Sequence, residues 1–213
     1  MTPAEQSRRA AGICALAPVV PVLVIDRIED AAPLARALVA GGLPALEVTL
    51  RTPVALDAIR AMAEVPGGMV GAGTLLTPAD VKAAKAAGAR FGVSPGATDR
   101  LLAACEDADL PLLPGAATAT EVMALLEKGY TVQKFFPAEA SGGAPALAAI
   151  GAPIPQVRFC PTGGIGPKNV ADYLGLGNVL CVGGSWVAPK DLVAAGDWDA
   201  IEALARAASA LPR

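Results

Sequence analysis

The residue of this sequence with the most evident chemical potential is Lys134, in the apolar stretch 131–139 (TVQKFFPAE). Its β-branched and aromatic residues, ended by a proline, predict a buried strand. Burial disfavours the ammonium form of a lysine, and an unprotonated lysine is a nucleophile that condenses with carbonyl compounds to give a Schiff base. The structural alternative is a lysine that reaches the strand end or pairs with a buried carboxylate. The remaining lysines fall in predicted helices, turns or loops: Lys82, Lys85, Lys128, Lys168 and Lys190.

A second strand, 45–50, carries a polar face. Alternation places Glu47, Thr49 and Arg51 on one side and two apolar residues on the other. The apolar side must meet helices, so the polar side is expected to point into the interior of a barrel. A buried carboxylate needs a cationic or hydrogen-bonding partner, and Lys134 is a candidate. An ion pair between Glu47 and Arg51 that only shapes the barrel is the alternative.

Two glycine clusters end the last two apolar stretches. The first is 160–166 (CPTGGIG) and the second is 182–185 (VGGS). Exposed backbone N–H groups at the ends of late strands, beside a helix N-terminus, commonly form a phosphate site in parallel barrels. Glycines that merely allow tight turns are the alternative, but two such pairs on consecutive strands favour phosphate binding.

Composition excludes several classes of protein. The chain has 213 residues, 54% of them hydrophobic, and a net charge of −3 without a long basic run, so a nucleic-acid partner is not expected. Pro, Gly and charged residues interrupt every apolar run before the roughly 18 residues that a membrane-spanning helix needs. The polar N-terminus does not resemble a signal peptide, so we expect no membrane association and a cytoplasmic location.

The potential metal ligands are few. There is no histidine, so acid–base chemistry must use carboxylate, lysine, hydroxyl or water. The cysteines show no CxxC spacing and are interpreted as reduced, mostly buried small hydrophobic residues. Without histidines or a carboxylate cluster, no metal site is expected. The cysteines are Cys14, Cys105, Cys160 and Cys181.

The order of apolar stretches predicts the fold. Eight of them alternate with helix-compatible segments at intervals of about 20–25 residues, the size of a compact β-loop-α unit. This pattern predicts one α/β domain over residues 1–213, a TIM (β/α)₈ barrel with an extra N-terminal helix at 3–16. An open doubly wound sheet is the alternative, but the GAG at 71–73 lacks the third glycine of a dinucleotide motif. The eight stretches are 19–25, 45–50, 69–74, 91–96, 110–115, 131–138, 156–164 and 178–185.

Helix boundaries are marked by capping residues. Thr52-Pro53 and Thr77-Pro78 each place an N-cap before a proline at the first helical position. Gly88 and Gly129 are expected to end the helices that precede them. The last helix is expected near 197–210.

Several motifs of the chain together resemble one known family, the 2-keto-3-deoxy-6-phosphogluconate (KDPG) aldolases, which also act as 4-hydroxy-2-oxoglutarate (KHG) aldolases. The motifs occur in family order and span most of the chain, from residue 18 to about residue 189. They are 46–52 (LEVTLRT), 70–74 (VGAGT), 93–96 (VSPG), 134–139 (KFFPAE), 156–165 (QVRFCPTGGI) and 182–186 (VGGSW).

The resemblance implies a metal-independent class I aldolase that needs no cofactor beyond the imine on its own lysine. It implies that Lys134 is the Schiff-base lysine and Glu47 the general acid/base. The pyruvate carboxylate and the pocket wall would then match Arg51, Thr74, Thr162, Pro95 and Phe136. The substrate phosphate would match Gly163, Gly164, Gly184 and Ser185. Gln133 departs from the family, whose members usually have a hydrophobic residue there; alternation places it toward the helices, where its amide needs a partner.

The activity implied is cleavage of 2-dehydro-3-deoxy-6-phosphogluconate, a small phosphorylated 2-keto acid, to pyruvate and glyceraldehyde 3-phosphate. Cleavage of 4-hydroxy-2-oxoglutarate to pyruvate and glyoxylate is expected as well, and the resemblance also implies a homotrimer. The motifs do not distinguish the gluconate substrate from its galactonate epimer, which is the alternative. A non-catalytic sugar-phosphate-binding barrel would have no use for a buried Lys134 facing Glu47. Phosphate-handling isomerases and thiamin-pathway synthases usually carry a metal or histidine site.

Overall fold

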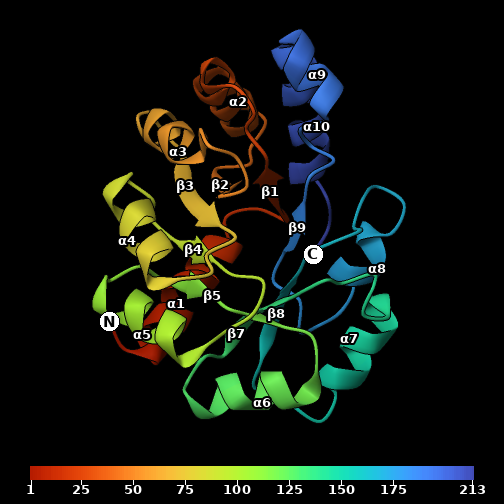
Figure 1. The fold of residues 1–213 in the computed structure, drawn as a ribbon. Helices are drawn as coiled ribbons and strands as arrows, with labels where there is room; N and C mark the ends of the chain where they lie inside the picture. The colour runs from red at the N-terminus through yellow and green to blue at the C-terminus, as the bar shows by residue number, and fades with distance from the viewer.

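The computed structural model describes all residues, 1–213, and shows eight parallel strands surrounded by helices (Figure 1). The predicted (β/α)₈ barrel is confirmed, and each strand lies within one of the eight predicted apolar stretches or directly follows it. The strands are β1 (Val19–Leu23), β2 (Ala45–Thr49), β3 (Met69–Gly73), β4 (Gly92–Val93), β5 (Leu112–Leu113), β6 (Gly115–Ala116), β7 (Val132–Phe135), β8 (Arg158–Pro161) and β9 (Val182–Gly184).

The nine strand labels make eight barrel positions. β5 and β6 are two halves of one strand that is interrupted at Pro114, which has no N–H to donate. β5 pairs with β4 in the six-stranded sheet β5-β4-β3-β2-β1-β9, and β6 pairs with β7 in the three-stranded sheet β6-β7-β8. A bridge between Thr162 and Gly183 joins β8 to β9 and closes the ring.

The helices form the outer layer, except for α1, which crosses the N-terminal end of the barrel. None of the helices is long and apolar enough to cross a membrane. Their bounds are α1 (Pro3–Cys14), α2 (Ile28–Ala40), α3 (Ala55–Ala63), α4 (Pro78–Ala86), α5 (Asp99–Asp107), α6 (Ala119–Glu127), α7 (Gly143–Gly151), α8 (Val170–Leu174), α9 (Lys190–Ala195) and α10 (Trp198–Ser209).

The predicted helix caps are confirmed at one position and wrong at another. Thr77 caps α4, and its hydroxyl accepts from the Asp80 amide in a capping box. Thr52 does not cap α3, which begins three residues later at Ala55. The Thr52 hydroxyl instead donates to the Ile25 carbonyl oxygen at 2.6 Å, which joins the ends of β2 and β1. Gly88 and Gly129 both have φ near +98°, in the left-handed conformation that favours glycine after a helix.

Along the strands, successive side chains point alternately to an apolar region outside the barrel and to one inside it. Those that point outward from the strands belong to a continuous core of 50 buried residues shared with the surrounding helices. Those that point inward near the N-terminal ends of the strands form a separate group of 11 residues with the inner face of α1. Gln133 points outward, as alternation predicts, and its amide donates to the carbonyl oxygens of Val122 (3.1 Å) and Tyr130 (2.9 Å).

Helix α1 closes the N-terminal end of the barrel. The side chain of Gln6, which is fully buried, accepts a hydrogen bond from the Leu112 amide at 2.9 Å. The Ser7 hydroxyl donates to the Gly129 carbonyl oxygen and accepts from the Thr131 amide. The extra N-terminal helix is therefore part of the barrel core, because it satisfies backbone groups that the short β5 and β7 leave unpaired.

Candidate active site

The predicted pair of Lys134 and Glu47 meets inside the barrel. Lys134 projects inward from β7 and Glu47 from β2, and Lys134 Nζ lies 3.3 Å from Glu47 Oε1. Both residues are almost completely buried, with 5% and 3% of their surface exposed. Two charged side chains from opposite halves of the chain therefore converge in a region that water hardly reaches, as the alternation of β2 predicts.

Glycines in β3 provide the space that the Glu47 side chain occupies. A Cβ atom on Gly73 would lie 2.3 Å from Glu47 Oε1, and one on Gly71 would lie 2.4 Å from the Phe91 ring. The GAG sequence at 71–73 thus has a steric reason within the barrel and no relation to dinucleotide binding.

Burial controls the electrostatics of the pair. Removal from water raises the pKa of Glu47 above its usual range, and the nearby Lys134 ammonium only partly opposes this effect. The Lys134 ammonium also lies 5.3 Å from the centre of the Phe136 ring, within the range of a cation–π contact. A carboxyl group that keeps its proton to higher pH than an exposed glutamate is suited to act as a proton donor in catalysis.

Arg51 and Thr74 lie at the C-terminal ends of β2 and β3. Arg51 Nε donates to Thr74 Oγ1 at 3.3 Å, and the Arg51 side chain is exposed at the barrel mouth. Thr74 has a φ of +63°, a left-handed conformation that is strained for a β-branched residue. Such strain often marks residues at functional sites, which agrees with the predicted role of Thr74 in binding a carboxylate.

An open cavity of about 460 Å³ occupies the C-terminal mouth of the barrel. Two cationic residues, Arg51 and Lys190, are among the residues that line it. Seven of the predicted site residues border it: Arg51, Phe136, Thr162, Gly163, Gly164, Gly184 and Ser185.

Four predicted residues do not line this cavity. Lys134 and Glu47 lie deeper in the barrel, and Thr74 reaches the cavity only through its contact with Arg51. Pro95 packs its backbone against Gly115 of β6, where a Cβ atom would lie 2.3 Å from the Pro95 carbonyl. Gly115 is the register partner of Lys134, so Pro95 lies one strand away from the lysine.

Thr162 provides a free polar group in the site. Its side chain is 6% exposed, and its hydroxyl has no hydrogen-bond partner within the chain. A buried hydroxyl without a partner is uncommon, because its desolvation is not compensated. Thr162 lines the cavity, but its hydroxyl oxygen is itself buried, so the role of Thr162 in holding the pyruvate carboxylate stays a prediction.

The first glycine cluster presents free amides to the same cavity. Gly163 and Gly164 have φ of +106° and +78°, and their N–H groups make no hydrogen bond within the chain. Their carbonyl oxygens are occupied, one by the Glu139 amide at 3.0 Å and the other by the Asn169 side chain at 3.2 Å. The Ser185 amide is also free. Unpaired N–H groups that converge from two loops form an anion-binding site.

Sequence reasoning missed the residues that hold this loop in place. Asn169 accepts from the Gly166 amide at 2.8 Å while it donates to Gly164. The Tyr173 hydroxyl donates to the Glu139 carboxylate, whose side chain packs against Gly164. A helix-capping signal could have indicated Asn169, which directly precedes α8, but neither contact follows from sequence spacing.

A lysine paired with a glutamate inside a parallel barrel, beneath a mouth lined by unpaired backbone N–H groups, is typical of the class of Schiff-base-forming enzymes. Comparison with known proteins identifies the family. The model of the KDPG and KHG aldolase family matches residues 11–204. The chain is 54% identical over 200 residues to the KHG/KDPG aldolase of Escherichia coli K12, covering 93% of this chain and 94% of that protein. The chain therefore belongs to the KDPG and KHG aldolase family.

Solved structures agree with this assignment. The KDPG aldolase of Zymomonas mobilis ZM4, crystallised with 3-phosphoglycerate, is 52% identical, with a TM-score of 0.93 over 97% of this chain and 98% of that chain. The KDPG aldolase of Legionella pneumophila, with pyruvate captured as a covalent carbinolamine intermediate, is 50% identical. Its TM-score is 0.91 over 94% of this chain and 98% of that chain.

Proposed function

We propose that residues 1–213 form one class I aldolase domain that cleaves 2-dehydro-3-deoxy-6-phosphogluconate to pyruvate and glyceraldehyde 3-phosphate. The observation that carries this proposal is the buried contact of 3.3 Å between Lys134 Nζ and Glu47 Oε1. The carbinolamine in the Legionella relative, a covalent adduct of pyruvate, supports the same covalent chemistry for this chain.

The first half of the reaction forms the imine. Unprotonated Lys134 attacks the C2 carbonyl carbon of the substrate and forms a carbinolamine. Glu47, at 3.3 Å from the lysine nitrogen, donates a proton to the departing hydroxyl, and water leaves as the iminium forms. The raised pKa of Glu47 favours this step, because a protonated carboxyl group is needed to expel water.

The second half breaks the carbon–carbon bond. Glu47, which is now a carboxylate because it gave up its proton in the first half, removes the proton of the C4 hydroxyl, directly or through water. The C3–C4 electron pair moves toward the iminium, and glyceraldehyde 3-phosphate leaves. Glu47 reprotonates the enamine at C3, directly or through water, and hydrolysis of the imine releases pyruvate and restores Lys134. One lysine and one carboxylate carry out these steps in a chain that has no histidine.

The two ends of the substrate match the two parts of the cavity. Arg51, Thr74 and Thr162 are proposed to hold the carboxylate of the pyruvyl half; the contact between Arg51 and Thr74 and the unpaired hydroxyl of Thr162 support this assignment. The free amides of Gly163, Gly164 and Ser185, together with the Ser185 hydroxyl, would receive the phosphate, with Gly184 allowing close approach. Gly184 has no space for a side chain, because a Cβ atom there would lie 1.8 Å from the Trp186 ring.

We also propose activity toward 4-hydroxy-2-oxoglutarate, which the E. coli relative includes in its name. The gluconate substrate is favoured over its galactonate epimer, because curated relatives of 48–55% identity are named for the gluconate compound. A homotrimer is proposed from the family resemblance, supported by exposed Leu76 and Met123, which are 58% and 51% accessible in the single chain. Light scattering coupled to size-exclusion chromatography tests the assembly.

An assay that couples pyruvate to lactate dehydrogenase tests the activity. We expect turnover of 2-dehydro-3-deoxy-6-phosphogluconate, slower turnover of its galactonate epimer, and measurable cleavage of 4-hydroxy-2-oxoglutarate. A metal chelator should leave all rates unchanged. No pyruvate from any of the three compounds would reject the proposed function, and faster turnover of the galactonate compound would reject the preferred substrate.

A further inference from the structure

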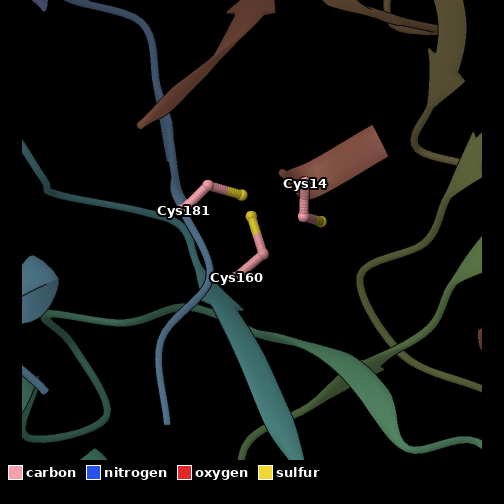
Figure 2. Close-up of side chains that lie close together, drawn as sticks. All are labelled: Cys14, Cys160 and Cys181. Atoms are coloured by element: carbon pink, nitrogen blue, oxygen red, sulfur yellow. The ribbon is translucent and has the colours of Figure 1, made fainter. Parts of the chain in front are cut away.

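Three of the four cysteines meet inside the barrel near its N-terminal end. Cys14 is the last residue of α1, Cys160 lies in β8, and Cys181 directly precedes β9. All three are free thiols and at most 2% exposed, and their Sγ atoms all lie within 4.8 Å of one another. Figure 2 shows the thiols of Cys160 and Cys181 pointing toward each other, with Cys14 beside them at the end of its helix.

The spacing of the sulfur atoms suits one metal ion. An ion in the plane of three thiolates, with metal–sulfur bonds of about 2.3 Å, holds the sulfur atoms about 4.0 Å apart. Separations of at most 4.8 Å need adjustments of less than one ångström to reach this geometry. The three ligands come from separate elements, so the closed barrel fixes their positions before any ion binds.

The surroundings offer no fourth ligand. Glu47 lines the same small cavity as Cys14 and Cys160, but its carboxylate is paired with Lys134 at 3.3 Å. The remaining members of this inner cluster are apolar: Ala10, Ile13, Val20, Ala45, Phe91, Val93, Leu113 and Val132. A structural zinc site is almost always four-coordinate, whereas soft thiolates without other donors select copper(I).

We propose that Cys14, Cys160 and Cys181 form a three-coordinate thiolate site for a soft cation, copper(I). On binding, each thiol loses its proton to solvent and its sulfur forms one bond to the ion. Three protons are released per ion, and copper remains monovalent, so no oxidant or reductant takes part. The site directly adjoins the Lys134–Glu47 pair, since Glu47 shares a small cavity with Cys14 and Cys160, and Cys160 is the register partner of Lys134. The proposal itself does not depend on the proposed function.

The proposed entry route for the ion is along the edge of α1. The small cavity beside Cys14 and an open groove on the outer side of the helix share Ile13 and Pro111 in their walls. The groove also contains Asp109 and Lys85. The side-chain hydrogen bonds between α1 and the barrel are made by Gln6 and Ser7, in the first half of the helix, whereas Ala10, Ile13 and Cys14 are held by apolar packing. A small displacement of the helix near Ile13 would connect the groove to the thiols.

Anaerobic titration of the reduced, full-length protein with copper(I), against a chromophoric copper(I) chelator, tests the proposal. We expect one ion per chain and a thiolate-to-copper charge-transfer band in the near ultraviolet. The variants Cys14→Ala, Cys160→Ala and Cys181→Ala should each lose the band and bind copper at least about tenfold more weakly. Cys105→Ala is the matched control, because this buried cysteine lies in α5 outside the cluster, and it should behave as wild type.

X-ray absorption of the copper-loaded wild-type protein provides a measurement that needs no variant. Three sulfur neighbours at about 2.3 Å are expected. Failure of the reduced, folded protein to bind copper(I) would overturn the proposal. Nitrogen or oxygen neighbours in the absorption data, or equal binding by wild type and all three cluster variants, would overturn it too. Circular dichroism confirms that each variant is folded before it is compared.

Discussion

The two ends of the barrel interior are built from the same strands but filled in opposite ways. At the N-terminal end, small and apolar side chains pack beneath α1, and only a void of about 10 Å³ remains there. At the C-terminal end, Arg51, Thr162 and two glycine loops surround an open cavity of about 460 Å³. Glu47 and Lys134 lie between the two regions.

This difference explains how one small domain holds both a core and a reactive site. The closed end keeps water away from the underside of Glu47, and this desolvation raises the pKa of the carboxyl group. The open end admits the substrate to the same pair of residues. The apolar end therefore contributes to the chemistry indirectly, by excluding water from Glu47 and Lys134. The contacts with the substrate are expected at the polar end.

The largest effect is expected at the lysine. Lys134→Arg should abolish turnover, because arginine stays protonated and cannot form the imine. The coupled pyruvate assay measures the loss, and circular dichroism checks the fold. Lys168→Arg changes an exposed lysine and should leave the rate unchanged. Retained turnover in Lys134→Arg would mean that the buried lysine only shapes the barrel.

The next effect is expected at the carboxylate. Glu47→Gln keeps the size of the side chain but removes its exchangeable proton, so kcat should fall by about 10²–10⁴. Glu64→Gln, at an exposed position, is the control. A kcat within a factor of a few of wild type would make Glu47 a structural residue.

The pH profile gives an independent view of Glu47. Burial raises its pKa, so the protonated carboxyl group that expels water persists to higher pH than in an exposed glutamate. We expect kcat/KM to fall as pH rises through this raised value, and this alkaline limb should disappear in Glu47→Gln. An alkaline limb that persists unchanged in the variant would assign it to another group.

A smaller and selective effect is expected at the phosphate site. Ser185→Ala removes an exposed hydroxyl at the cavity wall and introduces no steric clash. A substitution of Gly164 is less suitable as a test, because the new side chain would collide with Glu139. We expect kcat/KM for the phosphorylated substrate to fall about tenfold, the effect of one hydrogen bond to a charged group. Cleavage of 4-hydroxy-2-oxoglutarate, which has no phosphate, should be unchanged. Equal losses on both substrates would show that Ser185 does not select the phosphate.

The loss of a single hydrogen bond at the closed end, which leaves the apolar side chains beneath Glu47 in place, should affect stability without affecting chemistry. Gln6→Ala leaves the buried Leu112 amide without its acceptor, and we expect a loss of about 1–3 kcal/mol in the free energy of unfolding. Denaturant titration measures this loss, and Arg8→Ala on the exposed side of α1 is the control. At a temperature where the variant is folded, kcat should equal that of wild type. A lower kcat in the folded variant would contradict the division between the two ends.

Much of the site could be predicted from sequence because strand alternation is a strict geometric rule. The inward direction of Glu47 and the outward direction of Gln133 both follow from counting residues along one strand. The contact between Glu47 and Lys134 did not follow from local spacing, because the two residues are 87 positions apart in the sequence. It could be expected only after a closed barrel was assumed.

Other features depend on contacts that the sequence does not encode locally. The start of α3 was misplaced because Thr52 bonds to the Ile25 carbonyl instead of capping the helix. The left-handed conformation of Thr74 could not be predicted, since β-branched residues rarely adopt it. The cysteine cluster was also missed, because its members are far apart along the chain and have no motif.

The central claim is that Lys134 forms a Schiff base with the substrate. Incubation with pyruvate and sodium borohydride, followed by peptide mass spectrometry, tests it most directly. We predict one reduced pyruvyl group per chain, located on Lys134, and none in Lys134→Arg. Modification of Lys168 or another exposed lysine, or no modification at all in the active enzyme, would contradict the account.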